Sequence, residues 1–314
     1  MKILVLGAGA VGGYFGGRLA EAGADVTFLV RSQRAELLAK TGLRISSKAG
    51  NLTLQPKCVL AEQVKPDYDI VMFTAKAYDL PSAVDAIAPA MAGGRGNVLP
   101  LLNGMSHLDL LDARFGREHV LGGVAYIAAT LAPDGEIKHL NDFHRVAFGP
   151  RHAAQKAVCD AFAAASGGAM PEFKRTDAVE QAMWDKWVLL ATLAGITCLM
   201  RAPIGDIAAT GSGAALTLAL LGESAAVARV EGFATPDAVR ANYSSMLTQK
   251  GSSFTASMLR DVESGGQAEG EHILGAMLVR ARQRSLATPV LEIAATHLET
   301  YAARCAREAA TKAR

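Results

Sequence analysis

The chain has 314 residues, of which half are hydrophobic and a fifth are charged, and its formal net charge is +2. This length suffices for two domains of ordinary size, and the composition is that of a globular protein. The Lys and Arg residues are scattered, which argues against a basic face for nucleic acid.

The first half of the chain alternates between strand and helix patterns. Helices are predicted over residues 11–23 and 32–42, and each ends at a glycine. Strands are predicted over residues 2–7, 24–31, 68–76, 96–104, 119–140 and 145–150. Strands separated by helices predict a parallel sheet, and the last two segments predict an antiparallel pair around an Asp-Gly turn.

From residue 178 onward the pattern becomes helical. Apolar residues recur with a helical period in residues 179–200, 213–233, 253–264, 270–285 and the tail from Thr288. We therefore expect two domains, residues 1–177 and 178–314. The first is predicted to be α/β with a doubly wound, mostly parallel sheet, and the second to be all-α.

A glycine-rich motif links the first strand to the first helix. Residues 7–12 read GAGAVG, so Gly7, Gly9 and Gly12 form the GxGxxG pattern, with Ala8, Ala10 and Val11 between them. The first glycine permits a tight turn, the second allows a pyrophosphate to approach, and the third lets helix and strand pack closely. A close helix–strand turn without a ligand would use the same glycines, but the strand and helix context favours a dinucleotide-binding Rossmann domain.

The end of the second strand bears on the choice of cofactor. Positions 29–33 contain no Asp or Glu, whereas Arg31 stands there and Arg34 follows. A carboxylate would accept a hydrogen bond from the ribose 2′-hydroxyl of NAD, and a guanidinium suits the 2′-phosphate of NADP. Arg31 therefore favours NADP(H), although a solvated arginine after a strand is the plainer alternative.

Cysteine spacing and hydropathy indicate the compartment. The four cysteines (58, 159, 198 and 305) are far apart and form no CxxC pair, which predicts free thiols in a reducing cytosol and no metal site. The longest uncharged apolar stretch, residues 188–200, is too short to cross a bilayer. We expect a cytoplasmic protein with no membrane or nucleic-acid partner.

Taken together, the motifs resemble the ketopantoate reductase (2-dehydropantoate 2-reductase) family. The resemblance covers nearly the whole chain and rests on residues 1–23, Arg31, TAKAYD (74–79), LLNGM (101–105), the lysine of AMWDKW and residues 257–271. It implies NADPH as cofactor, a 2-oxo acid as substrate and an active site in a cleft between a Rossmann domain and a helical domain. The family includes dimers, so a homodimer is possible.

The resemblance assigns catalytic roles to Lys186 and Glu269. Lys186 matches the proton donor of the family, and an alkoxide formed by hydride transfer does need a nearby cation that gives up a proton. The apolar residues after Lys186 should lower its pKa by desolvation, although a lysine at a domain boundary can also extend into water. Glu269 matches the acid that hydrogen-bonds the reacting oxygen or the cofactor amide and orients the lysine.

Further binding residues are implied at four positions. Asn103 matches an asparagine near nicotinamide and substrate, and Lys76 matches a lysine that contacts cofactor or substrate. Ser257 matches a substrate-contacting serine, and Asp261 follows one turn later on the same helix face. Without the family, Asn103-Gly104 would be interpreted as a plain turn and Glu269 as a charge at a helix start.

The sequence departs from the family in its substrate residues. Well-studied members carry asparagines where this chain has Leu190, Ala194 and Ile204, so we expect a more apolar pocket that discriminates differently. Three hypotheses follow: a ketopantoate reductase, a paralogue that reduces a more apolar 2-oxo acid, or an NADP(H)-binding regulatory protein without turnover.

Overall fold

The computed structural model describes residues 1–312. The chain folds into two units. The first comprises Met1–Leu102 and His107–Ala182, and the second comprises Asn103–Ser106 and the residues from Met183 onward. The predicted domain boundary between residues 177 and 178 stays a prediction. The two units differ from a single cut at that point, because the segment from Asn103 to Ser106 is grouped with the second unit.

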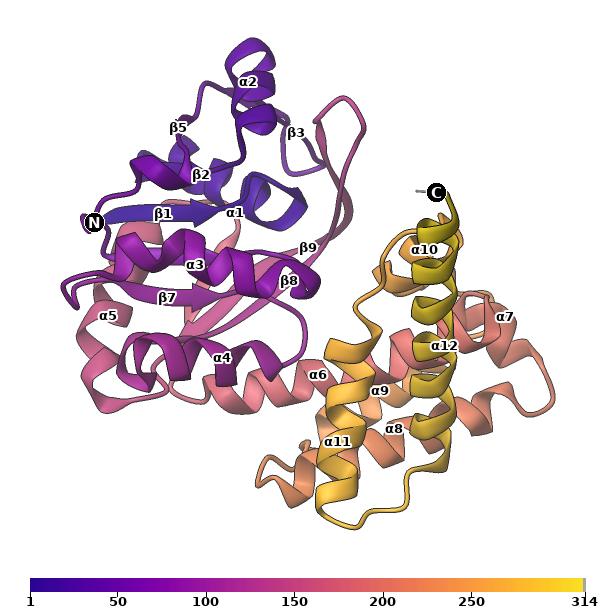
Figure 1. Ribbon diagram of the computed structural model, residues 1–314. Helices are drawn as coiled ribbons and strands as arrows, with labels where there is room; N and C mark the ends of the chain where they lie inside the picture. The colour runs from indigo at the N-terminus through magenta and orange to yellow at the C-terminus, as the bar shows by residue number, and fades with distance from the viewer. Residues whose placement is uncertain (313–314) are drawn as a thin grey trace. The chain divides into compact units, whose positions relative to one another are not determined.

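A parallel five-stranded sheet forms the centre of the first unit (Figure 1). Its strands, in spatial order, are β5 (Lys57–Val59), β2 (Asp25–Leu29), β1 (Lys2–Leu6), β6 (Ile70–Phe73) and β7 (Asn97–Pro100). The apolar runs of β1 and β6 are buried on both faces, as expected for strands covered by helices on either side. The sheet confirms the predicted doubly wound α/β fold.

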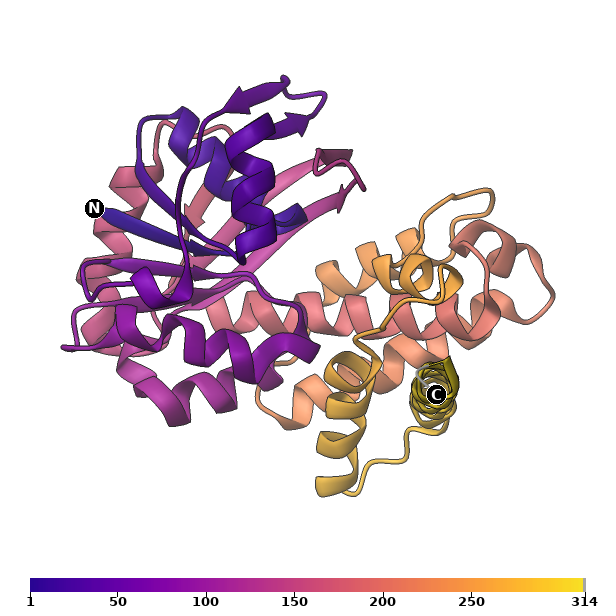
Figure 2. The ribbon, with the colours of Figure 1, turned by 45° about the horizontal axis from the view of Figure 1, so that its top comes forward.

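A second, mixed sheet lies in the same unit. It contains β3 (Leu43–Ser46), β4 (Leu52–Leu54), β8 (Gly122–Leu131), β9 (Ile137–Gly149) and β10 (Glu172–Arg175). The predicted antiparallel pair is confirmed, since β8 and β9 form a long hairpin, pink in Figure 2. The short strands β3, β4, β5 and β10 were not predicted, because three or four residues with partly exposed side chains carry little hydrophobic pattern.

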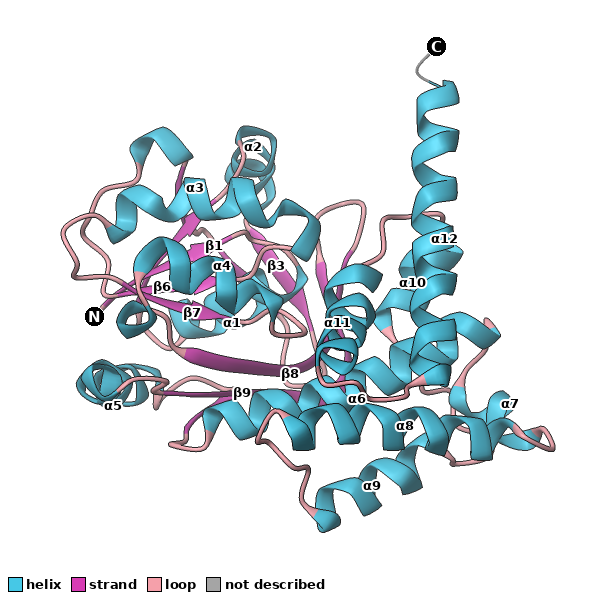
Figure 3. Ribbon diagram, turned by 60° about the horizontal axis from the view of Figure 1, so that its bottom comes forward, coloured by secondary structure: helices cyan, strands magenta, loops and turns pink. Residues whose placement is uncertain are grey.

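Helix α1 (Ala10–Glu21) packs between the two sheets, and its glycines explain how it fits there. A Cβ at Gly16 would lie 2.9 Å from Phe28 of the first sheet, and one at Gly17 would lie 2.8 Å from Leu43 of the second. Figure 3 shows α3 and α4 on the other face of the parallel sheet. The remaining helices of this part of the chain are α2 (Ser32–Thr41), α3 (Leu80–Met91), α4 (Ser106–Phe115) and α5 (Lys156–Ser166).

The second unit is helical, as predicted. Its elements are α6 (Val179–Met200), α7 (Ile204–Ala209), α8 (Gly213–Val230), α9 (Asp237–Leu247), α10 (Ser257–Glu263), the π-helical turn η5 (Glu271–Gly275), α11 (Ala276–Gln283) and α12 (Pro289–Lys312). The first turn of α12 is held by Glu223 of α8, whose carboxylate accepts the N–H groups of Val290 and Leu291. The short helices α7 and α9 were not predicted.

Two helices, α6 and α8, are long and apolar enough to cross a membrane by length and composition. A core helix of a soluble protein passes the same test, and 67% of the apolar window of α6 is buried inside the fold. The corresponding window of α8 is 39% buried. We therefore interpret α6 as a core helix, and the fold is consistent with a soluble protein.

Candidate functional site

The glycine-rich loop between β1 and α1 has the geometry of a dinucleotide-binding turn. Gly7 has φ +90°, a conformation that L side chains rarely adopt. A Cβ at Gly12 would lie only 2.3 Å from the Gly7 carbonyl oxygen, so close packing requires this glycine. At Gly9, by contrast, a Cβ would meet nothing within 4 Å, and its φ of −86° suits any residue. The fold therefore does not require glycine at position 9, whereas a bound pyrophosphate would.

The N-terminus of α1 is open to an anion. Gly9 occupies its N-cap and supplies no capping side chain, and the first turn carries no acidic residue. Unpaired N–H groups at such a helix start attract phosphate through hydrogen bonds and the helix dipole. The stretch Gly7, Ala8, Gly9, Ala10, Val11 and Gly12 thus fits the pyrophosphate of a dinucleotide.

Arg31 lies at the N-cap of α2, two residues after the end of β2. This corrects the prediction that it ends the strand, because its carbonyl already accepts the N–H groups of Arg34 and Ala35 as the helix begins. Its side chain is 80% exposed, and its Nη2 lies 3.3 Å from Oδ2 of Asp79. The guanidinium is accessible at the end of the strand next to β1, where a 2′-phosphate could reach it.

Arg34 has a different partner. Its Nε and Nη2 donate to the carbonyl of Ala8 at 3.2 and 2.8 Å, and Nη2 also reaches the carbonyl of Gly135 in the β8–β9 turn. Arg34 therefore ties the glycine-rich loop to the second sheet. Sequence reasoning noted Arg34 only as a neighbour of Arg31, because nothing in the spacing shows where its donors point.

Lys76 lies in the loop after β6, which is the third predicted strand. It is exposed and stands immediately before the 3₁₀ turn Ala77–Asp79. This position at the carboxyl end of a parallel strand is where ligands bind in open α/β sheets. Its role in binding cofactor or substrate stays a prediction.

In the helical unit, Lys186 and Asn103 form a hydrogen-bonded pair. The Lys186 ammonium donates to Oδ1 of Asn103 at 3.0 Å, although 83 positions separate the two residues. Burial lowers the pKa of Lys186 from 10.5 to about 8, and the nearby charge of Glu269 opposes that shift. A neutral amide can hold the ammonium without adding charge, so Lys186 is held in place and is a much stronger acid than an ordinary lysine.

Helix α6 holds Lys186 through its neighbour Trp187. The Trp187 side chain is 1% exposed, and its Nε1 donates to the carbonyl of Ile273 at 2.9 Å. The Arg280 guanidinium lies 5.1 Å from the ring centroid. These contacts join α6 to η5 and α11, and so keep Lys186 close to Glu269, which precedes η5 by two residues. Sequence reasoning gave Trp187 no role.

His272 was also missed. Burial lowers its pKa, while the charge of Glu269 and a hydrogen bond to the Asn103 backbone oppose that shift. Gly104 has φ +74°, and a Cβ there would lie 3.1 Å from the His272 ring. The Asn103-Gly104 turn is thus packed directly on η5. The π-helical turn itself has no clear sequence signal, although such turns are frequent at functional sites.

The other predicted substrate residues lie on several elements. Ser257 is exposed at the first position of α10, and Asp261 is partly exposed one turn later. Leu190 on α6 is partly exposed, whereas Ala194 is 2% and Ile204 is 0% exposed. Ala194 and Ile204 are therefore core side chains in this structure. Of the three, only Leu190 is partly exposed, and it follows Lys186 by one turn on α6.

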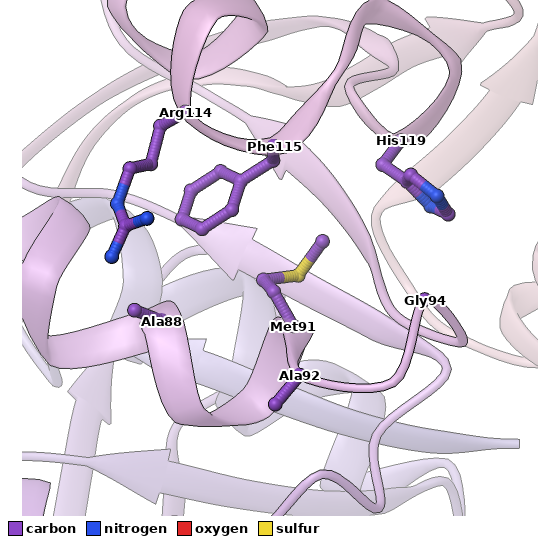
Figure 4. Close-up of a pocket in the computed structure, with 7 residues that line it drawn as sticks. All are labelled: Ala88, Met91, Ala92, Gly94, Arg114, Phe115 and His119. Carbon is purple, nitrogen blue, oxygen red and sulfur yellow. The ribbon is translucent and has the colours of Figure 1, made fainter.

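A separate pocket of about 350 Å³ lies on the first unit (Figure 4). It is lined by Ala88, Met91, Ala92, Gly94, Arg114, Phe115 and His119. None of these is a predicted site residue. Within residues 1–312, no group of three or more His, Cys, Asp and Glu side chains could hold a metal ion.

Comparison with known proteins agrees with this geometry. The family described as ketopantoate reductase PanE/ApbA matches residues 3–152, and its C-terminal domain matches residues 178–302. The chain belongs to the ketopantoate reductase family. The predicted family is thus confirmed, and the chain is an oxidoreductase that acts on a ketone or CH–OH group with a nicotinamide dinucleotide.

Three relatives show how far the similarity extends. An uncharacterized oxidoreductase, YkpB of Bacillus subtilis, is 39% identical over 303 residues, which cover 96% of this chain and 99% of the relative. The 2-dehydropantoate 2-reductase of Halobacterium salinarum is 27% identical over 93% of this chain and 95% of its own. The solved structure of 2-dehydropantoate 2-reductase from Geobacter metallireducens has a TM-score of 0.87 at 29% identity, covering 96% of this chain and 99% of that one.

Proposed function

We propose that this ketopantoate reductase family member catalyses the NADPH-dependent reduction of a 2-oxo acid to a 2-hydroxy acid. The family default is ketopantoate to pantoate, a step of pantothenate biosynthesis, in the cytoplasm. The observation that carries the proposal is the Lys186–Asn103 hydrogen bond, which presents an ammonium group whose pKa burial has lowered to about 8. Such a group is suited to give a proton to an oxygen near neutral pH.

The chemistry adds one hydride and one proton across a carbonyl. The bound NADPH would supply the hydride to the carbonyl carbon. Lys186 would donate its proton to the carbonyl oxygen as negative charge develops there, while Asn103 holds the ammonium. Glu269 would orient Lys186 and help it regain a proton, and Ser257 and Asp261 would contact the substrate. Lys76 would contact the cofactor or the substrate carboxylate.

Arg31 supports NADPH rather than NADH as the cofactor. We expect Arg31→Ala to weaken NADPH binding by about 1–3 kcal/mol while NADH binding changes little, because only NADPH carries a phosphate for this guanidinium. Dissociation constants for both cofactors, measured by titration of nucleotide fluorescence, provide the check. Equal weakening of both would mean that Arg31 does not bind the 2′-phosphate.

The substrate has a specific alternative, which Leu190 favours. Leu190 has accessible surface on the helix that carries Lys186. By the family resemblance, well-studied members carry an asparagine at this position. A leucine cannot hydrogen-bond the hydroxyl of ketopantoate, so a 2-oxo acid with a more apolar side chain would suit it better.

A panel of 2-oxo acids distinguishes these substrates through the rate of NADPH oxidation. Turnover of ketopantoate at an ordinary kcat/KM, about 10⁴ M⁻¹s⁻¹ or more, supports the family default. Turnover confined to larger apolar acids supports the alternative. NADPH binding without turnover of any acid would contradict both and would favour a regulatory protein.

A further inference from the structure

Arg31 and Asp79 form an ion pair next to the glycine-rich loop. The strand order β2-β1-β6 places the end of β1, and thus this loop, between the ends of β2 and β6. Arg31 follows β2, Asp79 follows β6, and their side chains meet at 3.3 Å. No Asp or Glu follows β2 directly in the sequence. The fold nevertheless brings the carboxylate of Asp79, from the segment after β6, to the side chain of Arg31.

The Asp79 carboxylate is not committed to holding its own helix. Asp79 occupies the N-cap of α3, where an aspartate side chain commonly accepts an N–H group of the first turn, but no such bond forms. Only its backbone takes part locally, since its N–H donates to Lys76 and its carbonyl accepts the hydroxyl of Ser82. The carboxylate is turned toward Arg31 instead, and it is 40% exposed.

We propose that Asp79 is a specificity-determining residue that lowers the preference of this site for NADPH over NADH. The inference rests on the proposed binding of the 2′-phosphate by Arg31. Any phosphate that reaches the Arg31 guanidinium must share it with Asp79 and come within a few ångströms of a second anion. This like-charge repulsion weakens NADPH binding. NADH has a neutral 2′-hydroxyl at this position. The Asp79 carboxylate does not repel this hydroxyl and can accept a hydrogen bond from it.

The test compares Asp79→Asn with the unmodified chain and uses two pairs of probes. The first pair is NADPH and NADH, and the second is 2′,5′-ADP and 5′-AMP, which differ only in the 2′-phosphate. Asparagine keeps the shape of the side chain and is as good an N-cap as aspartate, so the melting temperature should not fall. We expect the affinity ratio of NADPH to NADH, and that of 2′,5′-ADP to 5′-AMP, to rise by about three- to tenfold.

A matched control is available in the helical unit. Asp237 pairs with Arg240 at 3.2 Å on α9, so Asp237→Asn removes the same charge from another exposed ion pair and should leave both ratios unchanged. If Asp79→Asn also leaves both ratios unchanged, Asp79 does not set cofactor preference. Arg31→Ala separates that result from failure of the proposed function: selective loss of NADPH in this variant would keep Arg31 as the phosphate-binding residue even when Asp79 has no effect.

Discussion

Replacing Lys186 with methionine is expected to lower the turnover number by about 10²–10⁴-fold, while the dissociation constant for NADPH changes by less than about twofold. Methionine has a similar length but carries no proton to donate. The glycine-rich loop and Arg31 lie on other elements, so cofactor binding should persist. Steady-state NADPH oxidation with the best 2-oxo acid of the panel, together with fluorescence titration, measures both quantities.

The same residue predicts how activity depends on pH. Burial lowers the pKa of Lys186 to about 8, so the protonated fraction falls as the pH rises through that value. The reduction rate should therefore decline above about pH 8 if Lys186 is the proton donor. A rate that stays constant between pH 7 and 10 would place the proton donor elsewhere.

The stability of the fold should change with pH in the opposite direction to the activity. Because the folded-state pKa lies below the ordinary value of 10.5, the unfolded chain binds more protons between about pH 8 and 10.5. The contribution of Lys186 to the free energy of unfolding therefore increases with pH in this window. Removing this partly buried charge should not lower the melting temperature at pH 7, so lost activity in Lys186→Met would not reflect unfolding. Lys250→Met, which changes an exposed lysine of the same unit, serves as the matched control.

Alanine substitutions at Gly9 and Gly12 are expected to fail in different ways. At Gly12 the new Cβ would lie 2.3 Å from the Gly7 carbonyl and 2.3 Å from Oγ1 of Thr74, which itself donates to Leu6. Relieving these overlaps means moving β1 or α1, so we expect a loss of about 1–3 kcal/mol in the free energy of unfolding. Thermal or urea denaturation measures this loss.

Gly9→Ala should leave the fold intact and weaken NADPH at least about tenfold, because the methyl group enters the space that a pyrophosphate would occupy. The new Cβ meets no protein atom within 4 Å. Denaturation and NADPH titration, carried out on both variants, separate the two effects. Wild-type NADPH affinity in Gly9→Ala would show that the phosphates do not bind at this loop.

Sequence patterns predicted the fold most accurately where the pattern lies within one short segment of the chain. The buried strands and GxGxxG gave the parallel sheet and the loop, because spacing along the chain determines their geometry. The helical period identified α6, α8 and α12 for the same reason. The short strands of the second sheet have no such period, and two of them, β3 and β10, pair with β9, which lies far away in the chain.

Contacts between distant residues could not be predicted in the same way. The Arg31–Asp79 pair depends on the spatial order of strands, and the bond from Arg34 to the Ala8 carbonyl depends on the orientation of α2. Resemblance to the family named Lys186 and Asn103, but only the structure shows that they bond to each other. His272 and Trp187 gave no sequence signal, because a partly or fully buried ring that supports a site has the same pattern as any residue packed in the fold.

The grouping of Asn103–Ser106 with the helical unit has a consequence for how this protein can be recombined. A chimaera joined once, near residue 180, would combine the helices of one parent with the 103–106 segment of the other. Lys186 would then hydrogen-bond residue 103 of the other parent, and His272 would pack against residue 104 of that parent. These two residues evolved with a different set of helices. Exchange of substrate specificity between relatives therefore needs two crossovers, one on each side of the tetrapeptide, in addition to the one near residue 180.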